Sequence, residues 1–301
     1  MTTSYTEQLQ QGLINYQLLP IDYARIIENS DQREKFLSLF EKFQRHLEFL
    51  SNLYASDAGE IILFTNVTRN IFAQASPGKI TVSKGAIDFL LDLHINDCLQ
   101  LQIDGIDFNR EAMCEMAGFW IVAHEYFHIT RGHLKLCSKL YAEHSTGFEY
   151  DADNLASAAL FRFARSRFGL THDLKSIKCI ALLPIFWCIK TLIHFGHHRT
   201  VNGLHPAWEV RLAHVIAKLS HMGVPLPRDG YSPVTAEHEE YLIMTAFHYE
   251  KMYAQAKEPQ SSTFLKWIDS GRVVDEFCDP PSHWEKIQNA VQKNSMLHID
   301  R

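Results

Sequence analysis

The stretch NREAMCEMAGFWIVAHEYFHITRGH, residues 109–133, decides the fold that the sequence predicts. Its composition favours a helix, and its apolar residues lie on most faces of that helix, which is typical of a helix buried in the middle of a domain. The sequence HEYFH, His124 to His128, lies in the C-terminal part of this stretch. We therefore expect a core helix that carries two histidines and a glutamate.

The two histidines of HEYFH are four residues apart, so His124 and His128 lie on one face of a helix and can point their rings at one ion. Zinc in a hydrolytic site takes three protein ligands and keeps one position open for water. Glu125 then faces that water and can act as a general base. The alternative is a surface helix that happens to carry two histidines, but the apolar N-terminal half of the stretch is atypical of a surface helix.

A third ligand has several candidates, and their spacing separates them. His133 does not fit the extended pattern HExxHxxGxxH, because Arg131 replaces the glycine and Leu134 replaces the last histidine. Glu149 is the better candidate, since Asp153 lies one helical turn later on the same face. One carboxylate can bind the metal while the other orients a ligand histidine through its second ring nitrogen. The alternative is an acidic helix start that only complements the helix dipole.

A further helix and a small sheet are predicted before the core helix. The apolar residues of segment 30–54 recur at steps of four and three, which indicates an amphipathic helix. Asp31 and Glu34 have the spacing of a capping box at its start. Segments 60–67 and 79–83 are short and β-branched, so they predict strands.

More helices are predicted after the core helix. The Ala-rich segment 147–169 ends at Gly169, and segment 207–223 follows a proline. The apolar CIALLPIFWCI, residues 179–189, is well short of the roughly 20 residues that a membrane-spanning helix requires, so we expect a buried core helix. The predicted fold class is therefore α+β, mainly α-helical, with a small β-sheet and an HExxH active-site helix.

Composition argues against several classes of function. The net charge of -6 and the absence of a long Lys or Arg run argue against a nucleic-acid partner, so we expect a protein or peptide partner. The N-terminal MTTSYTEQLQQGLINYQ has neither the basic nor the apolar part of a secretory signal, so we expect a cytoplasmic location without a membrane. The six cysteines form no CxxC, which favours buried thiols in a reducing compartment over disulfides.

Four stretches between Asn70 and Leu212 share an order with a known family. They are NIFAQASPGKITVSKGAIDFL, HEYFHITRGH, FEYDADNLA and HPAWEVRL. Together they resemble the HtpX and CAAX prenyl protease family of zinc metallopeptidases, part of the gluzincin group. The resemblance implies a gluzincin-type core with one zinc ion per chain, in a soluble member of the family.

By matching position, the resemblance also implies roles for single residues. His124, His128 and Glu149 would ligate zinc. Glu125 would be the general base. Asp153 would orient a ligand histidine through its second ring nitrogen.

Two further elements of the site rest on the resemblance. His205 would stabilise the oxyanion, with Arg211 as its anchor. The strand KITVS, which contains Ile80, Thr81 and Val82, would be the edge strand along which an extended peptide substrate aligns.

These observations predict a zinc-dependent endopeptidase whose chain divides into three regions. They are an N-terminal helical region at 1–55, a zinc metalloprotease core at 56–225 and a C-terminal helical region at 226–301. The alternative is a catalytically silent, metal-binding protein-interaction module of the same fold. The intact Glu125 argues against that alternative, because a silent module has no need of the base.

Overall fold

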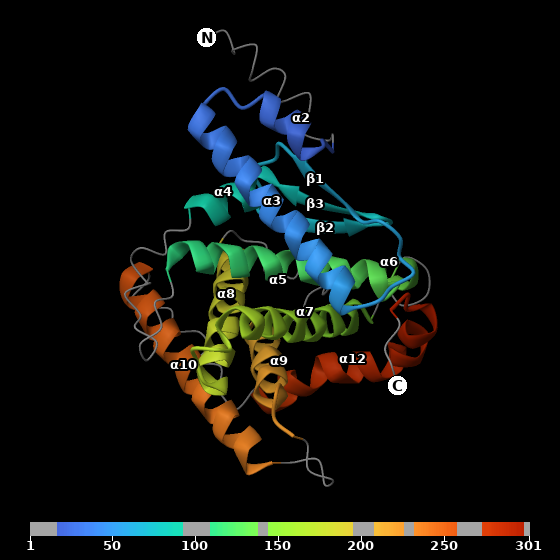
Figure 1. Ribbon diagram of the computed structural model, residues 1–301. Helices are drawn as coiled ribbons and strands as arrows, with labels where there is room; N and C mark the ends of the chain where they lie inside the picture. Colours follow the sequence, from blue (N-terminus) through green and yellow to red (C-terminus); the bar gives the residue numbers. More distant parts are fainter. Residues whose placement is uncertain are drawn as a thin grey trace.

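A computed structural model describes most of the 301-residue chain as a mainly helical fold with one small sheet toward one end (Figure 1). The described residues are 17–92, 109–137, 144–194, 208–225, 232–257 and 273–297. The helices are α2 (Pro20–Arg25), α3 (Ser30–Leu53), α4 (Lys84–Asp92), α5 (Arg110–Thr130), α6 (His133–Cys137), α7 (Ser145–Phe168), α8 (Leu174–His194), α9 (Trp208–His221), α10 (Pro233–Lys257) and α12 (Val273–Asn294). The strands are β1 (Ile62–Asn66), β2 (Ala73–Ser76) and β3 (Lys79–Ser83). The predicted fold class, α+β and mainly helical with a small sheet, is confirmed. The assignment to a gluzincin-type core remains a prediction.

The centre of the fold is α5, the predicted core helix (Figure 1). It packs against α3, α7 and α8 and against the edge of the sheet at β2. Its start is fixed by Asn109, whose side chain accepts a hydrogen bond of 2.9 Å from the backbone N–H of Ala112. The helix ends before Gly132, whose φ of 72° is a left-handed conformation that glycine adopts without strain. The HEYFH segment is thus held inside the molecule.

The helix predicted over 30–54 is α3, but its predicted capping box is wrong. Asn29 is the capping residue, and its side chain accepts a hydrogen bond from the backbone N–H of Gln32. Asp31 lies one residue inside the helix and pairs with Lys35. Because Asn is a strong capping residue, the helix starts two residues earlier than the Asp31 pattern predicted.

The apolar segment 179–189 lies in α8 and is buried, as predicted. It packs between α5, α7, α9 and α10, with Pro184 inside the helix. None of the helices in the described ranges is long and apolar enough to cross a bilayer. No disulfide joins the cysteines whose side chains are described, which are Cys114, Cys137, Cys179 and Cys188.

The sheet has the strand order β1-β3-β2, with β1 parallel and β2 antiparallel to β3. The two predicted strands are confirmed as β1 and β3, whereas β2 was not predicted. The prediction that Ile80, Thr81 and Val82 form an edge strand is wrong, because β3 is the central strand and these residues are buried. The reason is a tight turn at Gly78, with φ of 70°, which folds Ala73–Ser76 back onto β3.

The outer edge next to α5 belongs to β2. Phe72 accepts a hydrogen bond of 3.0 Å on its backbone oxygen from the N–H of Ser83. Bonded and non-bonded pairs alternate along an antiparallel ladder. The backbone N–H and C=O groups of Ala73 and Ala75 therefore point away from β3, toward the open edge.

One apolar core runs through all three predicted regions. Phe43 of the first region, Val122 of the second and Leu242 of the third belong to the same cluster of buried residues. A smaller cluster joins α12 to α6 and α7. The boundaries at residues 55 and 225 remain a prediction.

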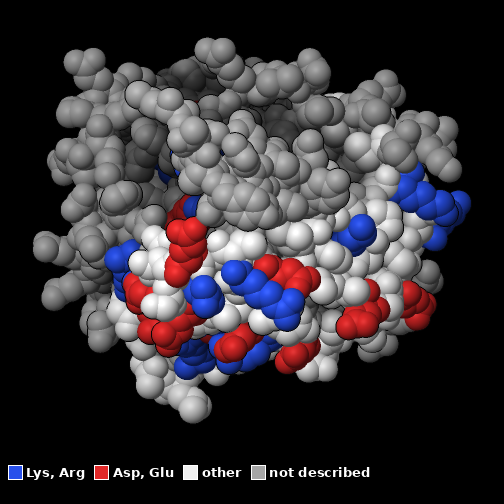
Figure 2. Space-filling view, turned by 90° about the horizontal axis from the view of Figure 1, so that it is seen from above, with Lys and Arg blue, Asp and Glu red and all other residues white. Residues whose placement is uncertain are grey.

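Charged side chains of both signs mix on the face seen in Figure 2. Lys and Arg alternate with Asp and Glu over its described part. Ion pairs form within α2, α3 and α4 and between α3 and α5. The described part of this face therefore presents no basic patch of the kind that binds nucleic acid.

His46 on α3 is a buried histidine whose two ring nitrogens have no hydrogen-bond partner. The rings of Phe119 and Phe163 lie 5.2 Å and 5.5 Å from it. Burial, with a smaller contribution from Arg45, lowers the pKa of His46 to about 3. The ring is therefore neutral in the folded protein under conditions that protonate it in the unfolded chain.

We expect this residue to reduce the free energy of unfolding as the pH falls from about 6.5 toward about 3. In that window the unfolded chain binds the proton and the folded chain does not, so the loss is up to about 1.4 kcal/mol per pH unit. His46→Leu should remove this contribution. Urea unfolding of both proteins at two pH values measures it, and an equal pH dependence in the two would contradict the prediction.

Candidate metal centre

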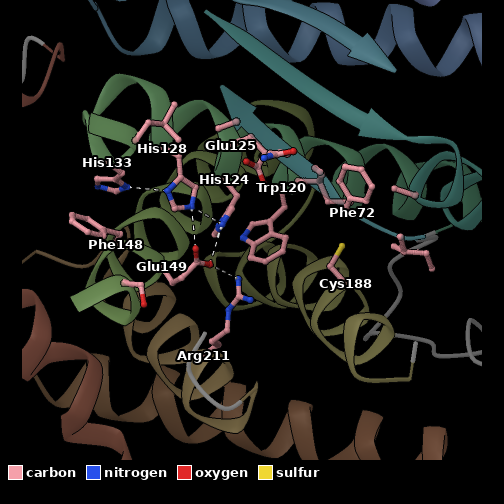
Figure 3. A pocket seen from close by; sticks show the side chains of 18 of the residues that line it. Phe72, Trp120, His124, Glu125, His128, His133, Phe148, Glu149, Cys188 and Arg211 are labelled. Atoms are coloured by element: carbon pink, nitrogen blue, oxygen red, sulfur yellow. Dashed lines mark hydrogen bonds and ion pairs between the residues drawn. The ribbon is translucent and has the colours of Figure 1, made fainter. Parts of the chain in front are cut away.

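Three side chains bring possible metal ligands together beside α5 (Figure 3). The Nε2 atoms of His124 and His128 lie 3.0 Å apart, because the two residues are one turn apart on the same helix face. The two carboxylate oxygens of Glu149 each lie 3.4 Å from one of these nitrogens. Glu149 reaches them from α7, which packs along α5.

The dimensions of this cluster fit a metal ion. Bonds of about 2.0 to 2.2 Å at tetrahedral angles place ligand atoms about 3.3 to 3.6 Å apart. The two separations of 3.4 Å between Glu149 and the histidines lie in that range, and the separation of 3.0 Å between the histidines is slightly shorter. Two imidazoles and a carboxylate are also the kind of donor set that binds such an ion. His124, His128 and Glu149 can therefore hold a metal ion.

Asp153 lies behind His124, on the far side of the ring from the cluster. Its Oδ1 is 2.9 Å from Nδ1 of His124. Arg211 donates two hydrogen bonds to the same carboxylate, at 2.7 Å and 2.8 Å. Burial alone would raise the pKa of Asp153, but Arg211 and His124 outweigh burial and hold it below its usual range. Asp153 is thus ionised, is held by Arg211 and lies at ion-pair distance from the rear nitrogen of His124.

Arg211 was predicted to anchor His205. His205 lies outside the described residues, so this contact stays a prediction. Within the described part, Arg211 holds Asp153 and also lies 3.8 Å from Glu149. It therefore supports both sides of the cluster.

The electrostatics of the cluster favour positive charge. Burial disfavours charge on His124, but the carboxylates of Asp153 and Glu149 outweigh burial and raise the pKa of His124 to about 10. A metal ion between the same groups would supply positive charge at the same place. This agreement is a second reason why the residues fit a cation.

A second group of residues, to which the sequence assigned no role, lies behind His128. The Nδ1 atom of His133 is 3.1 Å from Nδ1 of His128, and its Nε2 is 3.1 Å from a carboxylate oxygen of Asp151. Arg131 donates a hydrogen bond of 2.8 Å to Asp151. Burial alone would raise the pKa of Asp151, but His133 and Arg131 outweigh burial and lower it. The sequence feature that could have revealed this group is the last histidine of HEYFHITRGH, which is His133.

The cluster opens into a cavity of about 470 Å³ (Figure 3). Glu125 lines this cavity together with the cluster. One wall is formed by residues 71–75, which include the first three residues of β2. The other walls are largely apolar and include Trp120, Phe89 and Phe148. The cavity therefore joins the possible metal ligands, a carboxylate and an open strand edge.

The three residues of the cluster and Glu125 lie in the part of the chain that matches a known family, whereas the cavity wall at residues 71–75 lies outside it. Residues 110–224 match the model of a family described as Peptidase U49. This similarity supports the broader prediction of a peptidase, whereas the finer resemblance to the HtpX and CAAX prenyl protease family remains a prediction. No curated protein and no solved structure matches the chain.

Proposed function

We propose that the chain is a zinc-dependent endopeptidase with His124, His128 and Glu149 as ligands. The observation that carries the proposal is the three-residue cluster, which lies within the segment similar to a peptidase family and opens into a cavity. Three such ligands leave a fourth position for water, as hydrolytic zinc sites require. The order of HEYFH and FEYDAD along the chain supports a gluzincin-type site.

In this proposal, zinc supplies the Lewis-acid chemistry that makes water reactive at neutral pH and polarises the scissile carbonyl. Glu125 accepts the proton of the attacking water and then delivers it to the leaving amine. Its place in the cavity wall, next to a ligand histidine in the chain, supports this role. His205 is retained as a second donor to the oxyanion on the resemblance alone.

The open edge of β2 is the proposed binding site for the substrate backbone. The outward N–H and C=O groups of Ala73 and Ala75 lie at the cavity wall, where an extended peptide can add as a further strand. The apolar walls then accept apolar side chains of that peptide. This assignment replaces the one made for β3.

We expect Ala75→Pro to weaken substrate binding, because proline removes an outward N–H without breaking a bond to β3. The loss of one hydrogen bond of about 0.5 to 1.5 kcal/mol should raise KM by roughly 2- to 10-fold. Ala75→Gly, which keeps the N–H, is the control. Steady-state kinetics on one peptide measures both, and an unchanged KM in a folded Ala75→Pro protein would contradict this binding mode.

The proposal is tested by the zinc content and by the products of the protein in cells. The purified chain should contain about one zinc ion. After expression, mass spectrometry of cellular proteins should find new termini that Glu125→Gln does not produce. Zinc without any such termini would favour the silent binding module. A folded protein that binds no zinc would overturn the proposal.

A further inference from the structure

His133 is held against the back of His128 by the end of α5. Gly132, in its left-handed conformation, separates α5 from α6 and lets the chain fold back. The ring centroids of His133 and His128 are consequently 5.1 Å apart, with His133 almost completely buried. His128 presents Nε2 to the cluster, so its Nδ1 is the nitrogen that meets His133.

The chain of contacts continues to two charged residues. Beyond His133 lies Asp151, and beyond Asp151 lies Arg131, all three buried. Arg131 also lies 3.4 Å from the hydroxyl of Ser295, beyond the end of α12. Residues from α5, α7 and the C-terminal segment thus fix the position of the His133 ring.

The hydrogen positions in this chain follow from simple valence. A carboxylate only accepts hydrogen bonds, so Nε2 of His133 carries a proton and donates it to Asp151. A histidine that binds a metal through Nε2 carries its proton on Nδ1. His128 therefore donates from Nδ1, and Nδ1 of His133 must accept. A single arrangement of protons satisfies both contacts with His128 as a ligand.

We propose that His133 is a positioning residue, which accepts the Nδ1 proton of His128 and thereby fixes the tautomer and the orientation in which His128 binds metal. The inference rests on the proposed function, since it requires His128 to be a ligand. With this role for His133, each of the two ligand histidines is supported by one aspartate and one arginine. Asp153 and Arg211 support His124 directly, and Asp151 and Arg131 support His128 through His133.

The test compares zinc affinity in His133→Leu and His133→Asn. Leucine removes the acceptor, so the dissociation constant for zinc should rise by about 10- to 100-fold. The side-chain oxygen of asparagine can take the place of Nδ1 as acceptor, so His133→Asn should bind zinc within a few fold of wild type. Competition with a chromophoric chelator measures each affinity. His46→Leu, at a buried histidine that does not line the cavity, is the control.

Several outcomes overturn the inference. Wild-type affinity in His133→Leu would do so, as would an equal loss in folded His133→Leu and His133→Asn. If His133→Leu does not fold, ring ¹⁵N shifts of the zinc-loaded wild type still decide, because His133 must carry its proton on Nε2 alone. A proton on its Nδ1 would reject the role. A wild type that binds no zinc would instead refute the proposed function.

Discussion

Purified Glu125→Gln should bind zinc as wild type does and should cleave a peptide at least ~10² to 10⁴ times more slowly, the range for loss of a general base. Glutamine keeps the size of the side chain but cannot take a proton from water. The carboxylate that we propose as the proton acceptor at the cavity wall is then lost. We expect the loss in kcat, with KM changed little, because the base acts in the transition state.

The matched control is Glu111→Gln on the same helix. The Glu111 carboxylate pairs with Lys42 on α3 and does not line the cavity, so its loss should leave the rate unchanged. Zinc content and thermal unfolding are measured on both variants. Full activity in Glu125→Gln, with zinc bound, would refute the proposed base.

The helices around the site were largely predictable, because their sequences carry local signals. The core helix predicted over 109–133 has an apolar composition, and its N-terminal capping residue, Asn109, directly precedes it in the sequence. The helix at 147–169 is rich in alanine and ends near Gly169, which caps it. The spacing of His124 and His128 placed both rings on one face, as the structure has them. Local sequence is enough to predict a helix because the backbone hydrogen bonds of a helix form within the helix itself.

The order of the strands was not predictable in the same way. The four residues Ala73–Ser76 have a sequence, AQAS, that lacks the β-branched and aromatic residues typical of strands. They form a strand because the Gly78 turn pairs them with β3. The edge of a sheet is a property of the whole sheet, so β3 was wrongly predicted to be the edge.

The support behind His128 also escaped the sequence. Asp151 is two residues from both Glu149 and Asp153, and the pattern alone does not separate their roles. The separation comes from the packing of α7 on α5, which brings Asp151 to His133 and Asp153 to His124. Helix packing at this level depends on contacts between segments distant in sequence.

The largest effect on metal binding is expected from the three proposed ligands. His124→Ala, His128→Ala and Glu149→Ala should each weaken zinc binding by well over ~100-fold. Loss of a residue that only orients a ligand weakens metal binding by at most about 100-fold, so loss of a ligand itself should have the larger effect. Each removes an atom of the cluster, and two remaining ligands hold zinc poorly. Glu115→Ala, on α5 but outside the cavity wall, is the control.

Asp153→Asn should weaken zinc binding far less, by roughly 10- to 100-fold. Asp153 contacts the rear nitrogen of His124 and is bonded twice to Arg211, so it orients a ligand without reaching the metal position. Glu149, in contrast, reaches the Nε2 atoms of both histidines. The order of the two affinities is the test, measured by chelator competition at one pH on folded proteins. If Asp153→Asn lost more affinity than Glu149→Ala, the carboxylate that binds zinc would be Asp153, and Glu149 would be the residue that supports it.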